Sequence, residues 1–148
     1  MDSTDVTCFG DCDGTVTASW GSLDPPYTLE WFDEGTGLPI GAPITPADPL
    51  GETLAGQCAG TYIALLTNAT GCVTSDTISI NEPPEITATI TPSDVTCNGA
   101  CDGSAVVVVA GGVPGYNYNW VPLPGGGQGT DNAIGLCAGL WDVEVTDA

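Results

Sequence analysis

The sequence predicts an all-β fold built from tandem β-sandwiches, and three observations predict it. Nearly every apolar run is short, alternates with a period of two and is bounded by Gly, Pro or Asp, a pattern typical of strands. The chain repeats itself once, and seven cysteines fall within 148 residues. Because 42% of the residues are hydrophobic, a folded core is expected rather than a disordered chain.

The repeat is visible when the sequence is compared with itself. The segment 5–14, DVTCFGDCDG, recurs at 94–103 as DVTCNGACDG, an offset of 89 residues. Farther along, Cys-Ala-Gly at 58–60 recurs at 137–139, an offset of 79 residues. The first repeat therefore carries ten extra residues, which we place in the Gly/Pro-rich stretch 35–51.

We expect two domains, residues 1–82 and 83–148, joined through a short linker that its prolines make stiff. The second repeat stops before any counterpart of Cys72, so we interpret the chain as a segment of a longer array. The odd number of cysteines then follows, with the eighth expected beyond the end. The competing interpretation is a stray functional thiol.

Alternation assigns an inward face to each main strand, and these faces are the predicted core. In the first repeat they are Val16, Ala18 and Trp20; Tyr27, Leu29 and Trp31; and Tyr62, Ala64 and Leu66. In the second they are Ala105, Val107 and Val109; Tyr116, Tyr118 and Trp120; and Trp141, Val143 and Val145. Further alternating runs cover 73–80 and 85–91. Five to seven strands per repeat, with a Trp on the third, favour immunoglobulin-like sandwiches.

Two outward faces carry apolar side chains against this pattern: Ile63 and Leu65 in the first repeat, Val106 and Val108 in the second. A neighbouring repeat or chain could cover the valines. The residues that could cover the first repeat's face lie in its insertion: Leu38, Ile40 and Ile44. The alternative is that solvent-facing strands simply tolerate these residues.

The charge pattern excludes several function classes. The chain has 19 Asp and Glu but no Lys, Arg or His. Nucleic acid and anionic membrane are therefore excluded as partners. Enzymes that use a histidine general base or a lysine Schiff base are excluded as well. No apolar run is long enough to insert into a membrane. Seven cysteines without histidine indicate disulfides and an oxidising, extracytoplasmic setting.

The paired Asp-Val-Thr-Cys-x-Gly-x-Cys-Asp-Gly, followed by Pro-x-Tyr-x-x-x-Trp and Cys-Ala-Gly, resembles the SprB-type repeat of large Bacteroidetes gliding and adhesion proteins. The resemblance implies a surface protein exported by type IX secretion. It also implies a long tandem array that projects from the outer membrane as an extracellular filament. The expected partners are neighbouring repeats, with surface polysaccharide or other filament chains as further candidates.

Four cysteines in the first repeat allow three pairings, and their spacing does not choose among them. The resemblance implies bridges Cys8–Cys72 and Cys12–Cys58, and Cys101–Cys137 in the second repeat, with Cys97 unpaired in this segment. The alternative is a zinc site, but the three-residue gap of Cys-x-x-x-Cys departs from the commoner two-residue gap. Redox catalysis is disfavoured because every nearby charge is negative.

No catalytic residue is expected, since no motif positions a pair of carboxylates. The weak candidates for a Ca²⁺ site, the one cofactor considered, are Asp11, Asp13 and Asp102. The alternative for Asp13 and Asp102 is a bond to the local backbone, as is common in Asp-Gly turns. Thr77 and Ser3 lie in short Asp-Ser/Thr motifs that resemble the O-glycosylation sites of this bacterial group.

The main hypothesis is therefore a non-catalytic structural and adhesive repeat of a surface filament, involved in attachment or gliding. The alternative is a carbohydrate-binding module, with a secreted hydrolase fragment as a third possibility. A sugar platform would need four aromatic residues on an exposed face: Trp31, Trp120, Tyr27 and Tyr116. Alternation places them inward, so burial of the two tryptophans distinguishes the hypotheses.

Overall fold

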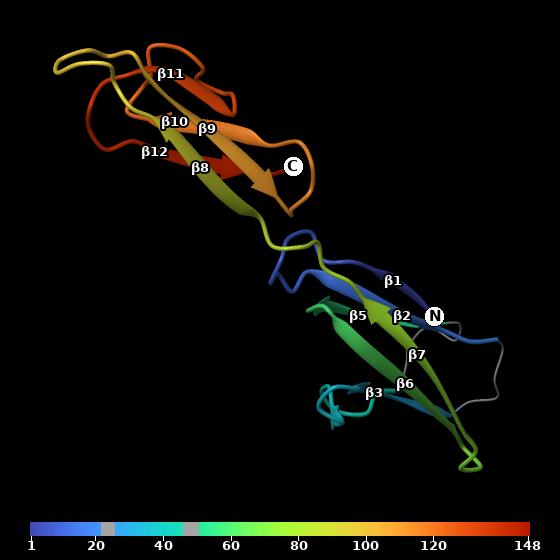
Figure 1. Ribbon diagram of the computed structural model, residues 1–148. Coiled ribbons are helices and arrows are strands. Elements are labelled where there is room, and N and C mark those ends of the chain that lie inside the picture. Colours follow the sequence, from blue (N-terminus) through green and yellow to red (C-terminus); the bar gives the residue numbers. More distant parts are fainter. Residues whose placement is uncertain (22–25, 46–50) are drawn as a thin grey trace. The chain divides into compact units, whose positions relative to one another are not determined.

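The computed structural model describes residues 1–21, 26–45 and 51–148. These residues form strands, turns and loops without any helix, and so without any helix able to cross a membrane. The chain divides into two compact units, Met1–Pro83 and Pro84–Ala148, here called unit one and unit two (Figure 1). The division lies one residue from the expected boundary.

Unit one is a sandwich of two antiparallel sheets. The first has the order β1-β2-β5, from Asp2–Thr4, Gly14–Ser19 and Gly51–Gln57. The second has the order β4-β3-β6-β7, from Leu38–Pro39, Tyr27–Asp33, Gly60–Asn68 and Val73–Ile80. This order follows the immunoglobulin scheme, with β1, β2 and β5 in the places of strands A, B and E. Strands β3, β6 and β7 take the places of C, F and G.

The predicted core of unit one is confirmed on all three strands. Val16, Leu29 and Trp31 are at most 4% exposed and pack with the inward residues of β6. Trp20 is the exception, because it lies half-buried at the edge of the core, where its ring meets Tyr27 edge to face at 5.5 Å. Alternation thus predicts which face is inward, whereas the sandwich edge sets the degree of burial.

The described part of the insertion extends the edge of the second sheet beside β3. Leu38 pairs with Asp33, and Ile44 forms a bridge with Leu29, so the segment runs beside β3. Leu38 is 64% exposed, whereas Ile40 packs against the core. On the outer face of β6, Ile63 and Leu65 are half-buried, and the expected cover over them stays a prediction. Residues 46–50 of the insertion lie outside the described residues.

Unit two repeats the design with fewer strands. One sheet has the order β11-β9-β8, from Asn132–Leu136, Gly103–Ala110 and Thr87–Ser93. The other pairs β10, Asn117–Val121, with β12, Asp142–Thr146.

The core of unit two is smaller than predicted. Its buried hydrophobic residues are Ala105, Val107, Trp120, Ala133 and Leu136. The other predicted inward residues are only half-buried, because a two-stranded sheet covers less of the facing sheet; they are Val109, Tyr116, Tyr118, Trp141, Val143 and Val145. On the outer face Val106 and Val108 are 41% and 63% exposed.

Strands β5 and β11 are equivalent and carry the same β-bulge. The register of β5 against β2 shifts at Gly56, and that of β11 against β9 shifts at Gly135. Both glycines have positive φ, 71° and 73°, a left-handed conformation that other residues adopt at a cost. The bulge lies just before the cysteine that enters the disulfide in each unit.

Candidate functional site

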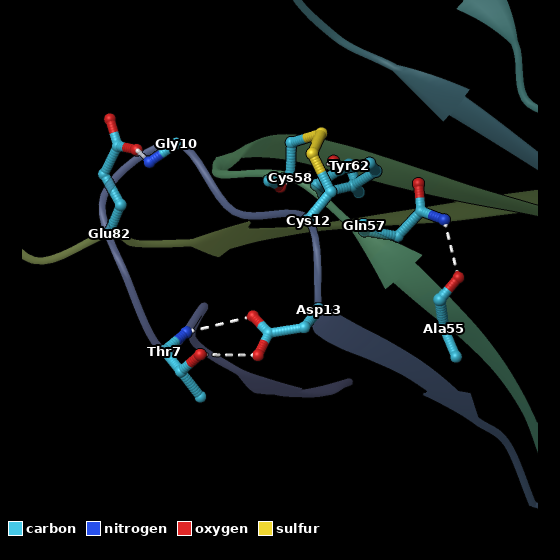
Figure 2. Close-up of a disulfide and its surroundings, with 9 residues drawn as sticks. All are labelled: Thr7, Gly10, Cys12, Asp13, Ala55, Gln57, Cys58, Tyr62 and Glu82. Carbon is cyan, nitrogen blue, oxygen red and sulfur yellow. Dashed lines mark hydrogen bonds between the residues drawn. A yellow bond between two sulfur atoms is a disulfide. The ribbon is translucent and has the colours of Figure 1, made fainter.

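The cysteine-rich loop that leads into β2 is the most distinctive chemical feature of each unit. Its turn is closed by a carboxylate, since Asp13 accepts hydrogen bonds from the Thr7 N–H at 3.0 Å and the Thr7 hydroxyl at 2.7 Å (Figure 2). In unit two Asp102 accepts the same pair from Thr96, at 3.0 and 2.5 Å. The sequence signal for this clamp is a Thr six residues before the Asp-Gly, present in both repeats.

These bonds lower the pKa of Asp13 and Asp102 below the ordinary 3.8, because a threonine hydroxyl and N–H stabilise the ionised form. Two of the three calcium candidates are thus engaged in closing a turn. Asp11 is exposed beside the same loop. Within 1–21, 26–45 and 51–148, no group of three or more Cys, Asp or Glu side chains is arranged to hold a metal ion.

Two of the three expected disulfides are present, Cys12–Cys58 and Cys101–Cys137. Cys12 directly precedes β2 of one sheet, and Cys58 lies in the crossover from β5 to β6 of the other sheet. The bridge therefore joins the two sheets at one end of unit one (Figure 2). An aromatic side chain supports each bridge, because Tyr62 and Trp141 donate hydrogen bonds to the carbonyls of Cys58 and Cys137.

The expected Cys8–Cys72 bridge is wrong, since both cysteines are free and exposed. Cys8 lies in the loop beside Cys12, at the end of unit one where β6 begins, whereas Cys72 follows the far end of β6. A strand of nine residues spans about 30 Å, several times the Cα separation that a disulfide tolerates. Cys97 is free and exposed in unit two, as expected of this segment.

The aromatic residues proposed as a sugar platform lie inside. Trp31 is 4% exposed and Trp120 is 2% exposed, which confirms their core assignment. The Trp120 indole donates a 2.9 Å hydrogen bond to the Thr130 carbonyl, so its polar edge is also satisfied inside the unit. Neither tryptophan presents a face on which a sugar ring could stack.

The two candidate glycosylation sites differ in accessibility. Thr77 is exposed on the outer face of β7. Ser3 is half-buried, and its hydroxyl donates a 3.2 Å hydrogen bond to the Ser79 carbonyl across the junction of β1 and β7. Attachment at Ser3 would break that contact, so Thr77 is the better placed of the two.

The fold and these contacts define a protein of tandem β-sandwich repeats, each closed by a disulfide and a Thr–Asp clamp. The family model of the SprB repeat matches the chain twice, at residues 2–36 and 89–124. Each unit therefore contains a segment of the SprB-type repeat. No curated protein and no solved structure matches it. The family is a structural repeat of Bacteroidetes cell-surface and extracellular proteins, and the disulfides indicate an oxidising compartment.

Proposed function

We propose that the chain is a non-catalytic structural and adhesive module of a long extracellular filament that serves surface attachment or gliding. The observation that carries the proposal is that the two units share the same stabilising contacts. Both units place a disulfide and a Thr–Asp clamp at the same corner. Trp31 and Trp120, which a sugar-binding face would need to expose, are used for packing.

Surface charge supports an extended array. With 19 acids and no basic side chain, neighbouring units repel one another over the range that salt screening allows. Association with oppositely charged surfaces is then the simplest role for the array. The same proposal includes export by type IX secretion and attachment to the outer membrane.

Force spectroscopy on a polyprotein of this chain tests the structural role. The Cys12–Cys58 bridge spans a sequence separation of 46 residues, which an oxidised unit one cannot extend. Reduction should therefore lengthen each unfolding event of unit one by about 160 Å, at ~3.4 Å per residue. Equal lengths before and after reduction would contradict the mechanical role.

Adhesion is tested by coating beads with the same polyprotein and measuring retention on polysaccharide and mineral surfaces at low and high salt. Retention that falls with salt and does not depend on one glycan is the expected result. Saturable binding of the single chain to one defined glycan would instead favour a carbohydrate-binding module.

A further inference from the structure

The outer face of the β11-β9-β8 sheet of unit two carries adjoining apolar side chains (Figure 1). Val106 and Val108 of the middle strand are 41% and 63% exposed, and Ile134 of β11 is 53% exposed. Ile134 lies opposite Ser104, two residues before Val106 on the same face of β9. The edge strand β8 adds three exposed residues opposite β9: Thr87, Thr89 and Thr91. These three apolar residues and three threonines are here called the β9 face.

The fold alone does not account for the apolar character of the β9 face, because unit one builds the equivalent face from other residues. The counterparts of Val106 and Val108 in β2 are Thr17 and Ser19. The Thr17 hydroxyl shares a 2.9 Å hydrogen bond with the Thr53 hydroxyl on that face. Two further positions differ in the same direction, with Ala55 for Ile134 and Asp2 for Thr91. At all four positions unit two has the less polar residue or the larger apolar one.

The exposure of the β9 face does not depend on where the sequence ends. In unit one β7 pairs with β6, so it belongs to the second sheet. The counterpart of β6 in unit two is β12, which pairs with β10 in the sheet opposite β9. A further strand beside β12 extends that other sheet and leaves the outer side of β9 as it is.

The β9 face is also free of acids. In Pro84–Ala148, all of which is described, the outward positions of β8, β9 and β11 hold only Thr, Ser, Val, Ala, Asn and Ile. The other outer sheet faces among the described strands carry carboxylates, from Asp2, from Glu30, or from Asp142 and Glu144. Because the sequence has 19 acids and no basic side chain, the β9 face is the sheet face that repels an acidic surface least.

This charge pattern indicates which partner fits. A basic partner finds no carboxylate on the β9 face and several on the other faces. An apolar contact needs a partner surface without carboxylates, because burying an unpaired carboxylate is costly. The β9 face of a second copy meets this requirement, and two identical faces related by a two-fold axis are self-complementary.

We propose that two copies of this chain associate side by side through their β9 faces. Val106, Val108 and Ile134 of one copy pack on the same residues of the other, as two sheets pack in a sandwich. The contact extends the proposed filament role, since it joins neighbouring filaments laterally. It does not rest on that role, because association of the isolated chain is measured without it.

The size of the β9 face sets the strength of the contact. The eight residues of β9 span about 26 Å and three strands span about 14 Å, which gives about 360 Å² per copy. A standard interface buries about 800 Å² per partner. A single contact is therefore weak, with a dissociation constant of about 1 mM. Several such faces along one filament bind more tightly through effective concentration.

The test follows the oxidised 148-residue chain by methyl NMR and sedimentation velocity up to about 2 mM protein. At about 0.5 M NaCl, where the Debye length is about 4 Å, the methyl resonances of Val106, Val108 and Ile134 should shift with protein concentration. Lowering NaCl to about 10 mM should weaken the association several-fold, because the copies then repel each other. No concentration dependence, or association that strengthens at low salt, would overturn the proposal.

Matched variants locate the contact. The double variant Val106→Thr and Val108→Ser resembles the residues of β2 at these positions, so the strand should still form, and urea unfolding checks this. It should weaken association at least tenfold. The control Ile63→Thr and Leu65→Thr changes the apolar pair on the outer face of β6 and should leave association unchanged. The reverse result would place the contact on unit one and overturn the proposal.

The reciprocal transfer tests whether the face is sufficient. Added to the weakened double variant, Asp2→Thr, Thr17→Val and Ser19→Val give unit one a face like that of β9 and should restore association. Failure to restore it would show that these side chains are not enough and would contradict the self-complementary contact. A chain that stays monomeric but still lengthens on reduction in force spectroscopy would refute the lateral contact and leave the proposed structural role in place.

Discussion

The Tyr62 hydroxyl donates a 2.7 Å hydrogen bond to the backbone carbonyl of Cys58. Burial of the ring, and secondarily the negative charge of Asp33, raises the pKa of Tyr62 above the ordinary 10.0. In unit two the equivalent Trp141 makes the same contact, from its indole N–H to the Cys137 carbonyl at 2.9 Å. An aromatic donor thus fixes the carbonyl of a bridged cysteine in both units, although the residue types differ.

Replacing Tyr62 with Phe should destabilise unit one by about 1 kcal/mol, the usual net contribution of one such hydrogen bond. Urea unfolding of the oxidised chain measures it, with Tyr118→Phe as the control, because no hydrogen bond of the Tyr118 hydroxyl occurs among the described residues. Since the pKa of Tyr62 is raised on folding, its contribution is complete below about pH 10 and is lost as the pH rises through the folded pKa. An equal loss in both variants would contradict the role of the Cys58 carbonyl.

Removing the Cys12–Cys58 bridge as the double serine variant should cost about 4 kcal/mol, from loop closure in the unfolded chain. For a unit of this size the unfolding midpoint then falls by roughly 15–30 °C. The matched control is the double variant Cys8→Ser and Cys72→Ser, which removes two exposed and unbridged thiols. Differential scanning calorimetry should show no change for the control. A comparable fall in both variants would restore the Cys8–Cys72 pairing.

Alternation of apolar and polar residues predicts the strands that bury one face in the core. Strands β2, β3 and β6 carry apolar residues at every second position, and the repeat transfers this assignment to unit two. The sequence does not predict strands β5 and β11. Each contains a bulged glycine, so its apolar residues do not alternate regularly, and its pairing partner lies far away in the sequence.

The site shows the same division between local and distant contacts. The Thr7–Asp13 clamp spans six residues and recurs in both repeats, so the sequence contains its signal. The contacts of Asp5 and Gly10 with residues 81 and 82 join the beginning of the unit-one sequence to its end. They depend on the sandwich bringing β7 beside β1, which no local pattern indicates. The expected Cys8–Cys72 bridge is wrong for the same reason. Strand β6 separates the two cysteines, and its length cannot be recognised from a local pattern around either one.

Substituting the bulged glycines should separate backbone strain from crowding. Gly56→Ala meets no atom closer than 3.9 Å, so its cost is the left-handed φ alone, about 1–2 kcal/mol. Gly135→Ala should cost more in unit two, because its Cβ would also lie 3.0 Å from the Cα of Gly125. Gly21→Ala, with open space around it and no positive φ, is the control. Chemical denaturation ranks the three variants, and an equal cost for Gly21→Ala would remove the bulge argument.

The clamp carboxylates should titrate abnormally and independently. NMR titration should place the pKa of Asp13 and of Asp102 below 3.8, because threonine donors stabilise both carboxylates. A lowered folded pKa means that the clamp contributes stability above the unfolded pKa and loses it as the pH falls through the folded value. Thr7→Val removes the hydroxyl donor and should raise the pKa of Asp13 while leaving that of Asp102, measured in the same sample, unchanged. A parallel shift of both would contradict local control.

Salt should stabilise this protein, although it weakens many others. In an ordinary protein added salt screens attractions as well as repulsions, whereas here the sequence contains 19 acids and no basic side chain. The one cationic group, the amino terminus, lies 3.8 Å from Asp76. Raising NaCl from about 10 mM to 0.1 M shortens the Debye length from roughly 30 to 10 Å and mainly removes repulsion. Both unfolding midpoints should therefore rise with NaCl. If the effect is screening, CaCl₂ at matched ionic strength should raise the unfolding midpoints by the same amount. A larger rise with CaCl₂, abolished by Asp13→Asn or Asp102→Asn, would reveal a calcium site at the clamp.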